Sequence, residues 1–105
     1  MKLSDMVPLE RDIQQARASD PEFRRKWDAS AFARAVAIEI VRYRADNNLT
    51  QAQLGEMTGL SQPAVARLES GDQTPTLKTL QQLSAGTGIK FRVDVVDGVP
   101  SLAAA

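Results

Sequence analysis

Apolar residues recur at helical intervals through most of the chain, and polar breaks divide them into segments. The first segment predicts a short helix over residues 8–18. Asp20 and Pro21 form a second start signal, because aspartate caps a helix and proline suits its first turn. A longer helix is expected to start at the cap Ser30 and to end near Asp46. Its apolar face contains Phe32, Val36, Ile40 and Tyr43.

Three shorter helices are predicted over residues 51–58, 62–69 and 77–85. Each follows a hydroxyl residue that can accept a hydrogen bond from a first-turn backbone N–H. These caps are Thr50, Ser61 and Thr76. Gly59 ends the first of the three, because glycine tolerates the left-handed backbone that a tight turn needs. The residues expected to face inward on the last are Leu77, Leu80 and Leu83.

The pattern changes to strict alternation over residues 90–96, which is typical of a strand. The residues on its apolar face are Phe91, Val93 and Val95. A single strand would leave backbone groups unpaired, so we expect it to pair with the same strand of a second copy in a homodimer. The alternative is an internal hairpin through Asp97 and Gly98, although Pro100 disfavours a second strand. Residues 99–105 are expected to form a loose tail.

Composition narrows the chemistry that this chain can perform. It has 105 residues, a formal net charge of zero, and neither cysteine nor histidine. A disulfide framework and a thiolate metal site are therefore excluded, and the commonest general base is absent. We expect no enzyme activity, no metal, no cofactor and no small-molecule substrate. Since no apolar stretch could span a bilayer and the N-terminus lacks the core of a signal peptide, we expect a cytoplasmic location without membrane contact.

The neutral net charge counts mildly against nucleic-acid binding, because nucleic-acid-binding domains are usually basic. The charges are unevenly distributed, however. Residues 1–23 carry five acidic and three basic groups, whereas residues 42–90 carry five basic and four acidic groups. A neutral total therefore conceals a slightly basic centre.

Residues 51–69 form the unit that carries the functional prediction, two short helices joined by a tight turn. Gly55 is the small residue that lets the helices cross closely, and Gly59 forms the turn. The apolar edge expected to pack inward consists of Leu54, Leu60, Val65 and Leu68. Gln62 and Arg67 remain on the outer side, where an amide and a guanidinium can read base edges.

This unit resembles the Xre/Cro–cI family of bacterial and phage repressors over residues 35–88. The matching residues are Leu49, Thr50, Gln51, Leu54, Gly59, Ser61, Gln62, Val65, Arg67, Leu68, Glu69, Gly71 and Pro75. The resemblance implies an all-α fold with a five-helix, lambda-repressor-like helix-turn-helix domain. To this domain we add an N-terminal helical extension and one C-terminal dimerising strand.

The resemblance also assigns roles to individual residues, with double-stranded operator DNA as the partner. Gln51 would bond a DNA phosphate, whereas Gln62 and Arg67 would face the major groove. Ser61 would cap the recognition helix and could also touch the DNA backbone. The residues flanking a loop that lies against phosphates in the family are Thr74 and Thr76.

At two positions, Pro63 and Arg67, the sequence is compatible with more than one kind of contact. Pro63 departs from the family pattern, because many members place a polar base-reading side chain there. Pro63 or Ala64 would instead contact a thymine methyl, and DNA shape would contribute to recognition. Without the motif, Arg67 could simply pair with an acidic neighbour, Glu69 or Asp72.

The wider pattern, PEFRRKWDAS before a long helix that ends in R-x-x-N-x-LTQ, resembles HigA-type antitoxins. Such antitoxins pair with a RelE/HigB-like ribonuclease toxin and repress their own operon. We expect toxin binding through residues 1–30, with Phe23, Arg24 and Trp27 as candidates. A core position against the long helix is the favoured interpretation of the two aromatic residues. Glu69 is expected to be structural and to pair with Arg42 or Arg44.

The sequence therefore predicts a helical extension over residues 1–28, a DNA-binding domain over residues 29–88, and a dimerising strand with a tail over residues 89–105. The predicted function is sequence-specific transcriptional repression by a HigA-like antitoxin. A free-standing Xre regulator and a protein-interaction module without DNA binding are the alternatives.

Overall fold

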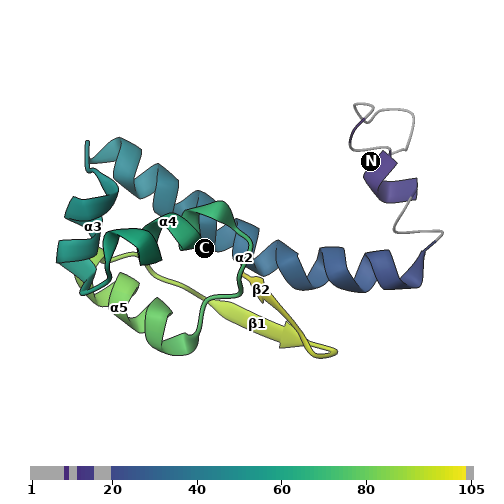
Figure 1. Cartoon of the computed structure of the whole chain (residues 1–105). Coiled ribbons are helices and arrows are strands. Elements are labelled where there is room, and N and C mark those ends of the chain that lie inside the picture. Colours follow the sequence, from purple (N-terminus) through teal and green to yellow (C-terminus); the bar gives the residue numbers. More distant parts are fainter. Residues whose placement is uncertain (1–8, 10–11, 16–19, 104–105) are drawn as a thin grey trace.

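The computed structural model is predominantly helical and describes residues 9, 12–15 and 20–103, apart from the side chains of residues 25, 28 and 29 (Figure 1). The elements are α2 (Pro21–Asp46), α3 (Gln51–Thr58), α4 (Gln62–Ser70), α5 (Leu77–Thr87), β1 (Val93–Val96) and β2 (Val99–Leu102). Residues 9 and 12–15 are helical, and the rest of the helix predicted over residues 8–18 lies outside the described residues.

The long helix α2 is continuous across the position where a new start was expected. Asp20 caps it, since its carboxylate accepts from the backbone N–H of Glu22 at 3.0 Å and of Phe23 at 3.2 Å. The prediction that Ser30 starts a second helix is wrong. Its hydroxyl instead donates to the Trp27 carbonyl at 2.9 Å, one turn earlier, so the side chain is satisfied within the helix.

The caps of the three shorter helices are confirmed. The hydroxyls of Thr50, Ser61 and Thr76 each accept from a backbone N–H three residues later. Gln53 reciprocates by accepting from the Thr50 N–H at 2.8 Å, which completes a capping box. Each helix start is therefore held by local hydrogen bonds.

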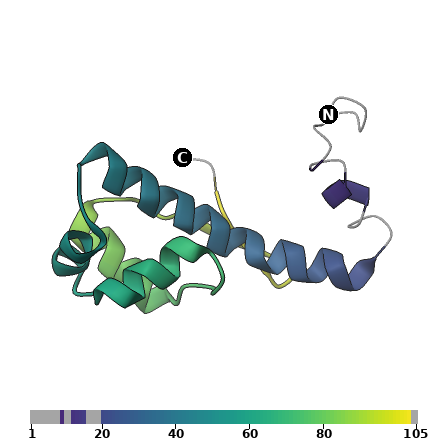
Figure 2. The ribbon, with the colours of Figure 1, turned by 45° about the horizontal axis from the view of Figure 1, so that its top comes forward.

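The core lies where α3, α4 and α5 pack against the C-terminal half of α2. Its fully buried cluster consists of Phe32, Val36, Ile40, Leu54, Val65, Leu80 and Leu83. The inward prediction for Leu77 is wrong, because this side chain is 71% exposed in the first turn of α5. The N-terminal half of α2 extends beyond this bundle, as both views show (Figures 1 and 2).

The C-terminal residues form a hairpin instead of one strand and a tail. β1 and β2 pair antiparallel, with Val96 opposite Val99 and Val95 opposite Pro100. Asp97 and Gly98 form the two-residue turn, with positive φ angles of 51° and 78°. The prediction of one strand unpaired in its own chain is therefore wrong and the hairpin alternative is confirmed, while the rest of the chain is mostly helical, as expected.

The position of Pro100 explains why the hairpin tolerates it. The Ala103 N–H donates to the Arg92 carbonyl at 2.7 Å, which makes this a hydrogen-bonded pair. Such pairs alternate along an antiparallel ladder, so Pro100 and Val95 occupy a position without hydrogen bonds between the strands. The nitrogen of Pro100 faces away from β1, and its missing proton costs the ladder nothing.

Candidate nucleic-acid interface

The turn between α3 and α4 fixes the orientation of α4. Gly59 has a φ of 75°, and the next residue, Leu60, donates its N–H to the Gly55 carbonyl at 3.0 Å. A Cβ on Gly55 would collide with the carbonyl oxygen of Leu60, so this position requires glycine. Val65 is completely buried on the inner side of α4. Because one side of α4 is anchored in the core, the opposite side must face solvent.

The sequence-predicted DNA-contacting residues lie on that open side or beside it. Exposed side chains are those of Ser61, Gln62, Pro63, Arg67, Thr74 and Thr76, and half-buried ones are those of Gln51 and Ala64. None of these eight side chains is part of the buried core. The face that the sequence assigns to base reading is therefore accessible.

A hydrogen-bonded network joins two of the candidate residues to the protein interior. The Gln62 amide donates to the Gln51 side-chain oxygen, and the Gln51 amide donates to the Glu69 carboxylate, both at 2.7 Å. Arg44 forms an ion pair with the same carboxylate, with Nε–Oε1 at 2.7 Å. This pair confirms the structural role predicted for Glu69, whereas Arg42 lies near Glu39 instead, at 3.6 Å.

A second group of candidate residues surrounds a cleft of about 170 Å³ between α4 and the loop before α5. The polar residues that line it are Arg67, Gln73, Thr74, Thr76 and Thr79. Sequence reasoning missed Gln73 and Thr79, because neither residue type nor spacing distinguishes them from ordinary surface polar residues. The Thr76 hydroxyl also caps α5 by accepting from the Thr79 N–H at 3.1 Å, which leaves Thr74 as the uncommitted hydroxyl of the pair.

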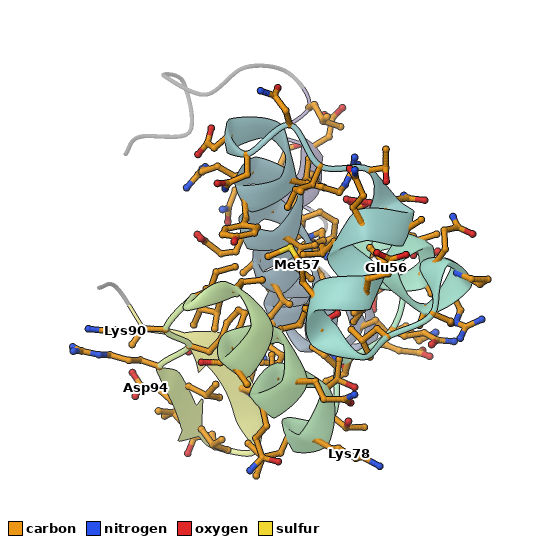
Figure 3. The ribbon with its side chains drawn as sticks, turned by 90° about the vertical axis from the view of Figure 1, so that its left-hand side faces the viewer. Glu56, Met57, Lys78, Lys90 and Asp94 are labelled. Atoms are coloured by element: carbon orange, nitrogen blue, oxygen red, sulfur yellow. The ribbon has the colours of Figure 1, made fainter. Side chains whose placement is uncertain are left out.

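The charge on this face comes mainly from Arg67. Within the part of the chain that the structure describes, Arg67 forms no ion pair, so neither Glu69 nor Asp72 neutralises it. The charge of Glu69 is already balanced by Arg44. Lys78 projects into solvent from the first turn of α5 (Figure 3). The outer face of α4 thus presents an uncompensated guanidinium to a ligand.

The candidate toxin-binding residues lie on the projecting half of α2. The rings of Phe23 and Trp27 stack with centroids 6.1 Å apart, and the guanidinium of Arg34 lies 3.8 Å from the Trp27 ring centroid. Both aromatic side chains are half-buried, and neither belongs to the core cluster, so the core interpretation is wrong. Arg24 is exposed on the same half of the helix.

The candidate dimerisation residues do not share one environment. Phe91 precedes β1 and packs against the core of its own chain, which removes it from the predicted apolar strand face. Val93 and Val95 are 39% and 67% exposed. Val93 also borders a groove whose other wall contains Leu77 of α5. Two of the three residues therefore remain accessible to a partner.

Comparison with known families is consistent with this geometry. A family model described as helix-turn-helix matches residues 40–93, which include α3, α4 and α5. The chain belongs to the helix-turn-helix family. This membership confirms the Xre-like resemblance and agrees with the prediction of a regulator without enzyme activity.

Curated helix-turn-helix relatives carry two kinds of name. An uncharacterized HTH-type transcriptional regulator of Haemophilus influenzae is 37% identical over 54 residues, which are 51% of this chain and 55% of the relative. Antitoxin HigA1 of two Mycobacterium tuberculosis strains is 29% identical over 90 residues, 86% of this chain and 59% of the relative. The chain thus spans between half and two thirds of the length of these relatives. No solved structure gave a significant match.

None of the helices in the described residues combines the length and the apolar character that a membrane crossing needs.

Proposed function

We propose that this helix-turn-helix protein is a sequence-specific transcriptional repressor that inserts α4 into the major groove of operator DNA. The observation that carries the proposal is the open outer face of α4, which bears the amide of Gln62 and the guanidinium of Arg67, a group without an ion pair among the described residues. Both groups can reach base edges from a helix that is anchored by Val65. Repression follows because a bound protein occupies the promoter.

The remaining contacts would set the register of α4 on the duplex. Gln51 has a second amide proton for a phosphate after it donates to Glu69. Ser61, Thr74 and Thr76 supply hydroxyls beside the same face. Pro63 and Ala64 supply apolar surface for a thymine methyl. Phosphate contacts position the helix, whereas Gln62 and Arg67 carry the sequence preference.

The test is selection of duplexes from a randomised pool by the full chain, followed by titration of the selected duplex at several salt concentrations. We expect one enriched sequence and an affinity that falls steeply with salt, because phosphate contacts release counterions. An unenriched pool, or a binding curve that does not change with salt, overturns the repressor proposal and favours an interaction module.

The repressor would act as a homodimer that pairs through the free edge of β1. In the ladder, the backbone groups of Val93 and Val95 point away from β2. In the described part of the chain, no backbone hydrogen bond joins this edge to another element. Pairing with β1 of a second copy would satisfy these groups. A two-fold axis there suits a palindromic operator with half-sites roughly 34 Å apart.

We further propose that the protein is an antitoxin that neutralises a RelE/HigB-like toxin in the cytoplasm and represses its own operon. The support is the name HigA1 of relatives that match 86% of the chain. A second support is the aromatic pair Phe23 and Trp27 on a helix half that extends beyond the bundle (Figure 1). Exposed aromatic and arginine side chains are preferred anchors at protein interfaces.

The antitoxin proposal is tested by co-expression with the neighbouring reading frame and by purification through a tag on this chain. A small basic ribonuclease that co-purifies supports it. If none is recovered while operator binding persists, the chain is a free-standing regulator, as the name of the Haemophilus influenzae relative suggests for that protein.

For domain organisation we propose a DNA-binding unit over residues 29–88, an extension before it and a pairing segment after it. The first boundary falls inside α2, which continues across residue 28 without a break. Residues 21–28 therefore continue into the DNA-binding unit as one helix instead of through a linker.

A further inference from the structure

Four side chains form one hydrogen-bonded chain that crosses from α2 through α4 and α3 to the outer face. Arg44 binds Glu69 through Nε at 2.7 Å and a second nitrogen at 3.3 Å. Glu69 accepts from the Gln51 amide, and the Gln51 oxygen accepts from the Gln62 amide, each at 2.7 Å. The side chain of Glu69 is only 7% exposed, so its partners lie within the protein.

The direction of every bond in this chain follows from its inner end. A guanidinium can only donate and an ionised carboxylate can only accept. Glu69 therefore requires the NH2 group of Gln51, and the oxygen of Gln51 is left facing Gln62. This oxygen requires a donor in turn, so Gln62 must turn its own NH2 group toward the protein.

The outer end of the chain then has a fixed chemical pattern. After its bond to Gln51, the Gln62 amide retains its oxygen and one N–H for a ligand. In the major groove, the amide oxygen can accept from the N6 amino group of adenine while the remaining amide N–H donates to N7. A reversed amide would present them in the opposite order and lose this match.

We infer that Glu69 is a specificity-determining positioning residue, which selects the base that Gln62 reads without touching the DNA. The inference rests on the proposed DNA-binding function and adds an origin for its base preference. In a Glu69→Gln variant, the new amide can donate or accept. Gln51 and Gln62 can then both reverse, and the base preference is lost.

The test uses a duplex that the wild-type chain selects from a randomised pool. Replacement of each base pair, measured with wild type and with Gln62→Ala, identifies the position whose preference depends on Gln62. We expect Glu69→Gln to reduce the preference at that position about tenfold, the lower range of what a bidentate base contact contributes. Preferences at other positions and the salt dependence remain those of wild type.

Two further variants separate positioning from folding. Gln51→Ala breaks the chain but retains the ion pair between Arg44 and Glu69, and it should lose the same preference. Glu39→Gln makes the same chemical change at the exposed ion pair with Arg42 and should leave base preference and duplex affinity unchanged. In a Gln62→Ala background, Glu69→Gln should have no additional effect on this base pair. If Glu69→Gln does not fold, Gln51→Ala decides the question.

The outcomes distinguish this inference from the proposed function. A wild-type chain that selects no sequence overturns both. A wild-type chain that selects a sequence, with full base preference retained in Glu69→Gln and Gln51→Ala, overturns the positioning role alone. Equal weakening at every position in Glu69→Gln, together with a lower melting temperature, would assign Glu69 a purely structural role.

Discussion

The α3–α4 unit and the two projecting segments, namely the N-terminal half of α2 and the β1–β2 hairpin, differ in what stabilises them. In the α3–α4 unit, caps and a glycine turn fix the two helices, and a partly buried ion pair with its hydrogen-bonded network orients Gln51 and Gln62. In the projecting segments, apolar side chains stay partly exposed: Trp27 is half-buried against Phe23 and Arg34, and Val95 is 67% exposed. The first region is complete as it stands, whereas the second has surface that a partner would bury. The proposed function would use both regions, the preorganised polar face for DNA and the apolar projections for proteins.

The largest expected effect is on folding stability and concerns the core beneath the outer face of α4. Leu54→Ala should lower the free energy of unfolding by about 2–5 kcal/mol, because Leu54 is 1% exposed and its removal leaves a cavity. The matched change Ile38→Ala, at a 55% exposed site on α2, should cost less than about 0.5 kcal/mol. Chemical denaturation measures both. Equal losses would mean that the exposed face of α2 is covered in solution.

The next effect tests the outer face of α4 directly. Arg67→Ala should weaken binding to the selected duplex by about 1–3 kcal/mol and relax the preference at one base pair. Arg42→Ala removes an equal charge from α2 and should leave base preference unchanged. Fluorescence anisotropy with single-base replacements measures both variants. If Arg67→Ala weakens all sequences equally, Arg67 binds a phosphate.

The hairpin can be tested at its free edge. Val95→Pro removes an N–H that points away from β2, so the ladder survives while pairing with a second copy loses a donor. We expect the dimer dissociation constant to rise at least about tenfold, which corresponds to about 1.4 kcal/mol. Val95→Ala retains the N–H and should remain dimeric. Sedimentation analysis that shows the same oligomeric state for both variants would contradict edge pairing.

The smallest of the four predicted effects is at the aromatic pair. Trp27→Ala removes a stacked ring and a contact with Arg34, and it should cost about 1 kcal/mol of folding stability. Operator binding should be unchanged, while recovery of the co-expressed toxin should fall sharply. Phe32→Ala serves as the contrast. Phe32 lies farther along α2 and is only 3% exposed, so its removal should destabilise the fold strongly. Unchanged toxin recovery in Trp27→Ala would remove this residue from the interface.

The sequence predicts the α3–α4 unit better than it predicts contacts between residues that are far apart in the chain. Thr50, Gly59 and Ser61 were interpreted correctly, because caps and left-handed turns depend on neighbours within a few residues. Glu69 was placed correctly as a structural residue because it follows the apolar edge of α4. Its bond to Gln51 is not predictable from the sequence, because Gln51 carries no charge that would single it out as a partner of the carboxylate.

The predictions that are wrong are those in which one local sequence pattern is compatible with two structures. Ser30 resembles a cap, but with no glycine or proline around it the helix continues through it. Pro100 argued against a second strand, but whether proline interrupts a ladder depends on the register, which the turn at Asp97 and Gly98 sets. Leu77 fits a helical face but lies one turn before the core begins.

The stacked Trp27 has a practical consequence for solution work. It is the single tryptophan of the chain and belongs to the N-terminal half of α2, the half that extends away from α3 and α4 (Figure 1). Its intrinsic emission should therefore respond when a protein covers that helix and stay constant when a duplex meets the opposite end of the molecule. With unlabelled protein, one sample could in this way follow two binding events by separate signals: tryptophan emission reports the protein ligand, and the anisotropy of a dye on the DNA reports the duplex.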